Sequence, residues 1–219
     1  MLSRPILLGH RGARATKSIP ENTFASFDRA LTDGCDGFEF DVRVTADGQA
    51  VIVHDPHSRG VEIARATSQQ LSWLPQVQDI LERYRDSAFL DIELKVSGVE
   101  QIILKLLQKY VPSRGFVVSS FLPEVLRSVR AESSSIPLGL ICESKPQVAE
   151  WRQSAVEYVI PHHKLASPEL IRELHAAGKK ILVWTVNDPA GMRHFAKAGV
   201  DGIISDDTKL LSETLAALN

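Results

Sequence analysis

Histidines, carboxylates and cations gather in four short segments of this 219-residue chain. The segments are Gly9-His10-Arg11-Gly12, Glu39-Phe40-Asp41, His54-Asp55 and Asp91-Ile92-Glu93-Leu94-Lys95. Residues two apart on a strand share a face, so Glu39 and Asp41 are expected to point the same way. Asp91, Glu93 and Lys95 repeat this arrangement. Such an inventory suits a metal-dependent enzyme that acts on a phosphate ester.

Converging carboxylates need a partner of opposite charge. Three or four of them in a partly dry cavity repel one another and raise their pKa values unless a cation neutralises them. A divalent metal is the simplest neutraliser, and oxygen-only ligands suit Mg²⁺ or Ca²⁺ better than Zn²⁺. The alternative is a rim of ordinary solvated salt bridges.

The dipeptide Asp47-Gly48 lies between β-rich flanks and predicts a hairpin after the second strand. If these two residues form the turn, Ala46 pairs with Gln49 and Asp41 lies opposite His54. Directly opposed residues of two strands point to one face. The sequence therefore predicts that His54 flanks the carboxylates.

His10, at the end of the first predicted strand, is expected to flank the same site from another side. Two imidazoles around one ester can act as base and acid, since each titrates near neutral pH. Arg11 and Lys95 could hold phosphate oxygens, with salt bridges to the carboxylates as an equally supported alternative. Trp184 could form an apolar wall at the mouth or belong to the core.

The elements that must position these residues follow a βα pattern, because short β-rich apolar runs alternate with segments of helical period. The strands are expected at Ile6–Gly9, Gly37–Val44, Ala88–Lys95, Gly115–Ser119, Leu138–Ile141, Tyr158–Ile160, Lys180–Trp184 and Gly202–Ser205. Eight strands with interleaved helices predict a single (β/α)₈ TIM barrel with a β-hairpin extension after the second strand, and barrel enzymes build their sites at the carboxyl ends of the strands. A doubly wound sheet is the alternative, but its glycine-rich dinucleotide fingerprint is missing.

Helix boundaries are predicted from capping residues. Asn22 is the expected N-cap of the first helix, Ser167-Pro168 opens a later one, and Gly34, Gly178 and Gly199 close three.

Bulk composition narrows the class of protein. A hydrophobic content of 44% in 219 residues allows one large core, so residues 1–219 are expected to form a single domain. A net charge of −2 without a basic stripe argues against nucleic-acid or anionic-membrane partners. No apolar run suits a signal peptide or stable membrane insertion, which predicts a cytoplasmic protein. Cys35 and Cys142 are expected to be free buried thiols.

The motifs together resemble the glycerophosphodiester phosphodiesterase family. They are His10-Arg11-Gly12, Pro20-Glu21-Asn22-Thr23, Gly37-Phe38-Glu39-Phe40-Asp41-Val42, Asp47-Gly48, His54-Asp55, Glu93-Leu94-Lys95, Trp184-Thr185-Val186-Asn187 and Asp201-Gly202-Ile203-Ile204, in family order. The resemblance implies a (β/α)₈ barrel that hydrolyses glycerophosphodiesters to sn-glycerol 3-phosphate and an alcohol. It also implies acid/base roles for His10 and His54, metal binding by Glu39, Asp41 and Glu93, and phosphate contacts from Arg11 and Lys95.

The chain departs from the family pattern in two places. Only the segment from Pro56 to Ser72 follows His54-Asp55 before the next helix, where members usually insert a longer one. The eighth strand ends in Ser205-Asp206-Asp207, without the threonine and proline often found there. The resemblance leaves open which alcohol is preferred.

Three other functions are compatible with the sequence. One is another phosphodiesterase or a phospholipase of the same barrel type. Another is a metal-dependent lyase or isomerase with Lys95 as the base, and a third is a non-catalytic ligand-binding barrel. Two histidines beside Arg11 fit a phosphate ester better than an enolate.

Overall fold

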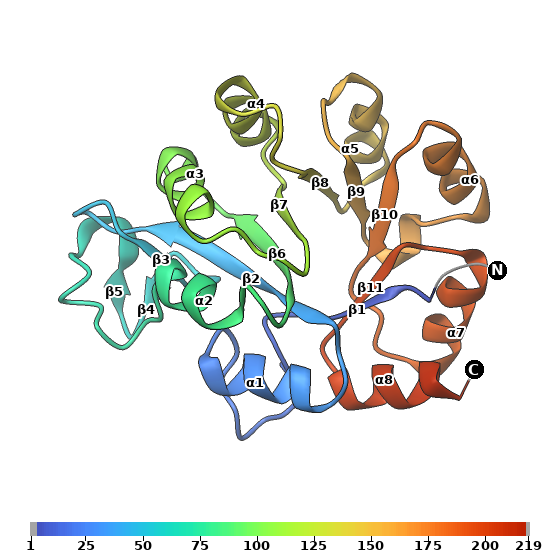
Figure 1. Ribbon diagram of the computed structural model, residues 1–219, viewed down its shortest axis with the longest axis horizontal. Coiled ribbons are helices and arrows are strands. Elements are labelled where there is room, and N and C mark those ends of the chain that lie inside the picture. Colours follow the sequence, from blue (N-terminus) through green and yellow to red (C-terminus); the bar gives the residue numbers. More distant parts are fainter. Residues whose placement is uncertain (1–3, 218–219) are drawn as a thin grey trace.

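Eight parallel strands close into a barrel in the computed structural model, which describes residues 4–217 (Figure 1). They are β1 (Ile6–Gly9), β2 (Gly37–Val44), β6 (Phe89–Leu94), β7 (Phe116–Ser120), β8 (Leu138–Cys142), β9 (Tyr158–Pro161), β10 (Lys180–Val183) and β11 (Gly202–Ser205). Strand β1 pairs with both β2 and β11, which closes the ring. The predicted TIM barrel is confirmed, and each strand lies within two residues of its expected ends.

Helices surround the barrel on its outer side (Figure 1). They are α1 (Phe24–Thr32), α2 (Val77–Tyr84), α3 (Glu100–Lys109), α4 (Pro123–Glu132), α5 (Lys145–Ala149), α6 (Pro168–Ala176), α7 (Pro189–Ala198) and α8 (Thr208–Ala216), with 3₁₀ turns η1 (Ile63–Arg65), η2 (Glu150–Gln153) and η3 (His163–Leu165). As predicted, Ser167 caps α6, and Gly199, with a φ of 83°, ends α7. None of the helices described is long and apolar enough to span a bilayer.

One predicted cap is wrong. Thr23, not Asn22, caps α1, because the Thr23 hydroxyl accepts a hydrogen bond from the Ser26 backbone amide at 3.3 Å. Asn22 instead adopts a left-handed conformation, with a φ of 58°, and its side chain turns toward the carboxyl ends of the strands. A polar residue that sequence rules place at a helix end is thus used at the site.

The extension after β2 consists of β3 (Ala50–Ile52), which pairs with β2 in antiparallel fashion, and a small hairpin of β4 (His57–Ser58) and β5 (Val61–Glu62). The extension is as predicted, but its register is not. Thr45 pairs with Gln49, so three residues form the turn, and Gly48 takes the left-handed position with a φ of 73°. This shifts the pairing by one residue, and Val53, not His54, donates its backbone amide to the Asp41 carbonyl at 3.0 Å.

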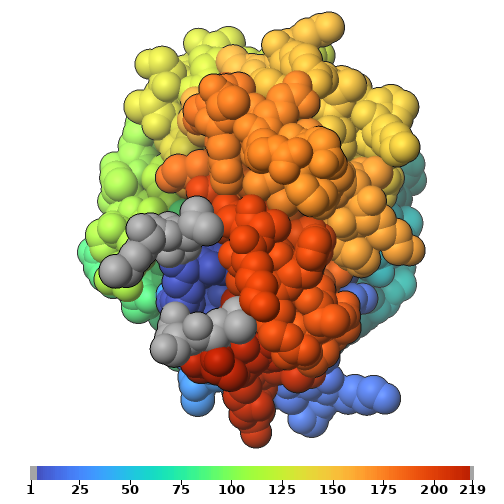
Figure 2. All heavy atoms as spheres, turned by 90° about the vertical axis from the view of Figure 1, so that its right-hand side faces the viewer, coloured from blue at the N-terminus to red at the C-terminus, as the bar shows by residue number. Residues whose placement is uncertain are grey.

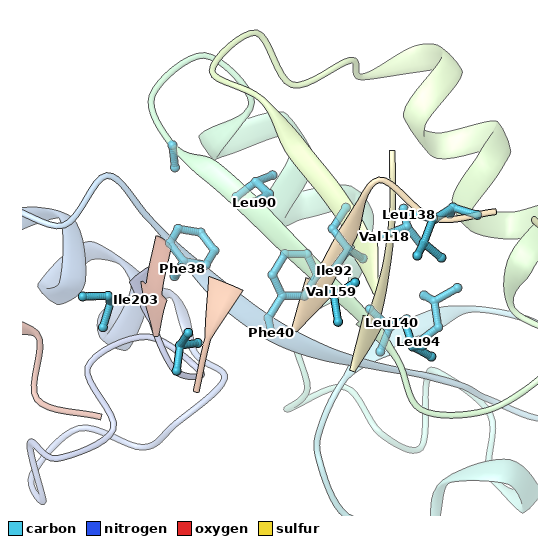
Figure 3. Close-up of a cluster of buried hydrophobic side chains, with 14 of the residues drawn as sticks. Phe38, Phe40, Leu90, Ile92, Leu94, Val118, Leu138, Leu140, Val159 and Ile203 are labelled. Atoms are coloured by element: carbon cyan, nitrogen blue, oxygen red, sulfur yellow. The ribbon is translucent and has the colours of Figure 1, made fainter. Parts of the chain in front are cut away.

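Side chains of the strands separate into two apolar layers. Phe38, Phe40 and Ile92 belong to the layer between the barrel and its helices, shown in Figure 3. Leu8 and Ile160 belong to the second layer, which fills the inside of the barrel. Side chains alternate between the two faces along β2 and β6. The acidic residues that alternate with these apolar residues therefore point into the barrel, as predicted from the sequence.

The first and last strands close the barrel side by side. In Figure 2 the orange and red C-terminal segments cover one face, with blue N-terminal atoms against them. Gly9 at the end of β1 is the register partner of Ser205 at the end of β11. Residues that follow these two strands therefore meet at the same rim.

Candidate active site

Three carboxylates converge at the carboxyl ends of β2 and β6. Asp41 and Glu93 are direct partners in the parallel pairing of the two strands, and Glu39 precedes Asp41 on the same face. All three side chains are buried, and one oxygen from each lies within 4.8 Å of the others. The sequence prediction that these residues meet is confirmed.

The electrostatics of this triad favour a bound cation. Burial, together with the charges of Asp41 and Glu93, raises the pKa of Glu39 well above its usual range. Burial opposes the charge of Asp41 too, but Arg11 and Lys95 outweigh it and lower the pKa of Asp41. Glu39 Oε1 is buried without a hydrogen-bond partner among residues 4–217. Oxygen donors, excess negative charge and an unpaired acceptor fit a divalent metal ion, which this triad could hold.

Lys95 lies on the same inner face. Its Nζ is 2.6 Å from Glu93 Oε1 and 3.3 Å from Asp41 Oδ1. Burial lowers the pKa of Lys95, but these two carboxylates outweigh it and raise the pKa above the usual value. The two ion pairs favour the charged form of Lys95, which suits contact with a phosphate better than the role of base in the lyase or isomerase alternative.

Arg11 is fixed by carboxylates on three sides. Its backbone amide donates to Glu39 Oε2 at 2.9 Å, its Nη1 donates to Glu21 Oε1 at 2.8 Å, and its Nε lies 3.1 Å from Asp41 Oδ2. Asn22 Nδ2 donates to the same Asp41 oxygen at 2.8 Å. Neither Glu21 nor Asn22 was predicted from the sequence to lie at the site, because their contacts depend on how the β1–α1 loop folds back.

His10 follows β1 and is oriented by Asp206, which follows β11. His10 Nδ1 lies 2.7 Å from Asp206 Oδ1, and His10 Nε2 lies 3.9 Å from Glu39 Oε2. Since a carboxylate only accepts hydrogen bonds, Nδ1 carries a proton, and Nε2 is the ring atom that faces the triad. Asn187 Nδ2 donates to the other Asp206 oxygen at 2.6 Å. Asp206 is a site residue that the sequence analysis missed.

His54 lies in the loop after β3 and lines the same cavity. Its Nδ1 is 2.7 Å from Asp55 Oδ1, and Arg43 Nε donates to its backbone carbonyl at 2.8 Å. The imidazole is 34% exposed, against 12% for His10. The structure brings His54 to the site as expected, although the predicted pairing with Asp41 is wrong.

The cavity has a volume of about 480 Å³ and two unlike sides. The side formed by β1, β2 and β6 is charged. The opposite side is mainly apolar, with Phe121, Ile141, Ile160, Trp184 and Ile204, and Glu143 and Gln147 add polar groups to it. The Trp184 indole Nε1 donates to the Ile160 carbonyl at 2.9 Å, and its ring meets the edge of Phe121 with centroids 5.6 Å apart. Trp184 is therefore a fixed part of the wall, which is one of the two alternatives that the sequence left open.

Asp91 lies deeper on β6 and also lines the cavity. Ser119 Oγ donates to Asp91 Oδ1 at 2.5 Å. Burial raises the pKa of Asp91 to about 7, although the Ser119 hydrogen bond opposes that shift. No role was assigned to Asp91 from the sequence.

Sequence comparison places the chain among known proteins. Residues 10–80 and 74–210 match the model of the "Glycerophosphoryl diester phosphodiesterase family". A "Glycerophosphodiester phosphodiesterase" of Caldanaerobacter subterraneus subsp. tengcongensis is 30% identical over 238 residues, which cover 95% of this chain and 96% of that protein.

Solved structures agree on the fold. A glycerophosphodiester phosphodiesterase from Thermotoga maritima has a TM-score of 0.83 and 25% identity, with 96% of this chain and 98% of that chain covered. An Oleispira antarctica phosphodiesterase, in complex with the product sn-glycerol-3-phosphate, has a TM-score of 0.85 and 23% identity, with 97% of each chain covered.

Proposed function

Since the chain belongs to the glycerophosphoryl diester phosphodiesterase family and is a phosphoric diester hydrolase acting on glycerophosphodiesters, we propose how it cleaves them. In this proposal His10 and His54 act as acid and base, and the products are sn-glycerol 3-phosphate and an alcohol. The observation that carries this proposal is the placement of both imidazoles in one cavity with the acidic triad. The product named for the Oleispira antarctica structure supports the same outcome.

One divalent cation, Mg²⁺ or Ca²⁺, is the proposed cofactor, with Glu39, Asp41 and Glu93 as its protein ligands. When bound, it supplies positive charge that neutralises phosphate oxygens and the charge that develops on them. Arg11 and Lys95 bring two further positive charges to the cavity wall, and we assign them phosphate contacts.

The histidines divide the proton transfers. In this mechanism one imidazole removes a proton from the attacking oxygen, and the other protonates the alkoxide that leaves phosphorus. Each ring is held at Nδ1 by a carboxylate, so each presents Nε2 for proton transfer. The exposed position of His54 also allows its proton to be exchanged with solvent between turnovers.

Release of glycerol 3-phosphate tests the function directly. Chelator-treated protein is supplied with Mg²⁺ or Ca²⁺ and with glycerophosphocholine, glycerophosphoethanolamine or glycerophosphoinositol. We expect metal-dependent release of glycerol 3-phosphate from at least one of them. No release from any of the three, with folded and metal-loaded protein, would overturn the proposal.

A further inference from the structure

Asp91 is a buried carboxylate with one free oxygen at the floor of the cavity. Its side chain is 1% exposed, and Ser119 Oγ occupies Oδ1. Oδ2 is buried without a hydrogen-bond partner among the residues that the structure describes. A buried acceptor left unpaired costs free energy, so a ligand that brings a donor to this oxygen gains affinity.

The surroundings of Asp91 define what that ligand looks like. Across the cavity, β8, β9 and β11 contribute Ile141, Ile160 and Ile204, which offer no hydrogen-bonding side-chain atoms. Glu39, the register partner of Asp91 on β2, also carries a buried oxygen without a hydrogen-bond partner in the described part of the chain. The floor thus faces a ligand with acceptors on one side and hydrocarbon on the other, which matches a short polyol with C–H and O–H faces.

The position of Asp91 along β6 determines which group of the substrate can reach it. Asp91 precedes Glu93 by two residues, which places it about 7 Å further into the barrel than this member of the triad. A phosphate held at the triad leaves its glycerol arm to span this depth. In an sn-glycero-3-phosphodiester the C1 hydroxyl is the group of that arm farthest from phosphorus, and it therefore reaches deepest.

We propose that Asp91 Oδ2 accepts a hydrogen bond from the C1 hydroxyl of the glycerol moiety and makes this chain selective for phosphodiesters whose terminal hydroxyl is free. This inference rests on the proposed function and names its specificity residue. A substrate esterified at that hydroxyl has no donor for Asp91, and its acyl group meets a closed floor of isoleucines. A substrate without the hydroxyl leaves Asp91 Oδ2 unpaired.

The test compares two phosphodiesters of ethanolamine. One carries glycerol, and the other carries propane-1,2-diol esterified through its primary hydroxyl, which lacks only the hydroxyl that corresponds to C1 of the glycerol moiety. We expect the native protein to prefer the glycerol ester by roughly 10- to 100-fold in kcat/KM, the range for a hydrogen bond to a charged group. Asp91→Leu should reduce this preference to about twofold or less. Asp91→Asn, which keeps a polar group at the floor, should retain most of it.

Ile204→Val is the matched control, because it alters the volume of the floor without touching the carboxylate. It should change the rates on both esters alike and leave their ratio as in the native protein. Thermal unfolding and metal affinity of each variant show whether the fold and the triad are intact, and Asp91→Ala replaces the leucine variant if that one does not fold.

Three results would overturn the inference. They are equal rates of the native protein on the two esters, an unchanged preference in Asp91→Leu or Asp91→Ala, and an equal loss on both esters in that variant. If the native protein hydrolyses neither ester nor any other glycerophosphodiester, the proposed function itself fails.

Discussion

His10 Nδ1 lies 2.7 Å from Asp206 Oδ1, although 196 positions separate the two residues in the chain. His10 follows the first strand of the barrel and Asp206 follows the last, and the pairing of β1 with β11 brings them together. The orientation of a proposed catalytic histidine thus depends on closure of the barrel. Local sequence around His10 carries no sign of it.

Asp206→Asn should lower kcat by roughly 10- to 100-fold with little change in KM, the scale typical of a carboxylate that orients a functional histidine. The amide can still accept at one atom, but it no longer supplies a charge beside the imidazole. Asp207→Asn is the control, because Asp207 caps α8 through the Leu210 amide and serves no histidine. Equal kcat values for the Asp206 variant and the native protein would show that the contact is dispensable.

The same residue should make stability depend on pH. Burial opposes the charge of Asp206, but hydrogen bonds from His10 and Asn187 and the charge of Arg14 outweigh it and lower its pKa to about 2. Because its pKa is lowered in the folded state, Asp206 stabilises the fold at pH values above its unfolded-state pKa near 3.8. This stabilisation is lost as pH falls through about 2. Asp206→Asn should therefore cost roughly 2 kcal/mol of unfolding free energy near neutral pH. In denaturant titrations the gap from the native protein should close between about pH 4 and about pH 2, and a constant gap would contradict the assignment.

Metal binding should stabilise the protein more at high pH than at low pH. Burial and neighbouring carboxylates raise the pKa of Glu39, and burial raises that of Glu93. A carboxyl group with a raised pKa contributes stability to the metal-free fold at low pH, and this contribution is lost as pH rises through the raised pKa. The gain in Tm on adding Mg²⁺ or Ca²⁺ to chelated protein should widen from about pH 5 to about pH 8.

Glu39→Gln is the variant that checks this assignment. It removes one charge from the triad, so metal affinity and activity should fall together while the metal-free Tm rises at about pH 8. Full turnover of chelator-treated native protein would refute the requirement for a cation.

Each of His10→Ala and His54→Ala should lower kcat by roughly 10²- to 10⁴-fold, the usual contribution of a general acid or base. A p-nitrophenyl leaving group needs little protonation, so it should rescue whichever variant lacks the acid and leave the other slow. This rescue assigns the two roles. The native rate should fall at both low and high pH, with apparent pKa values that belong to the pair. Near-normal rates of both variants on glycerophosphocholine would leave the histidines only a positioning role.

Cys35 and Cys142 should be dispensable for chemistry. Burial raises the pKa of each thiol to about 12, and neither lines the cavity. Thiols of this kind are inert. Native protein should resist a thiol reagent that labels the unfolded chain, and the double Cys→Ala variant should keep its kcat within about twofold. Loss of activity in a variant with native-like circular dichroism would contradict this.

The barrel could be predicted from the sequence because its strands repeat one pattern. Alternation on β2 and β6 sets which residues face inward, so the meeting of Glu39, Asp41 and Glu93 follows from local rules once the strands are parallel neighbours. The hairpin shows where such rules fail. Asp47-Gly48 fits a two-residue turn, but Ala46 joins it and Gly48 becomes the third residue, which moves His54 out of register with Asp41.

Residues whose role depends on distant backbone could not be predicted. Asn22 is of a residue type that is common at helix N-caps, yet the conformation of the β1–α1 loop directs its side-chain amide to Asp41. Asp206 contacts His10 only because the last strand of the barrel pairs with the first. Spacing within a segment carries no information on either contact.

The two unlike sides of the cavity have a consequence for protein engineering. The proposed reacting groups come from β1, β2, β6 and the loop after β3, whereas Phe121, Ile141 and Trp184 come from β7, β8 and β10. Libraries confined to these three positions would vary the shape offered to an ester arm while leaving the ionisable groups in place. An exchange of the C-terminal half of the barrel would have to retain Asp206, whose carboxylate orients the His10 imidazole. Substrate preference could thus be changed while the proposed catalytic residues stay the same.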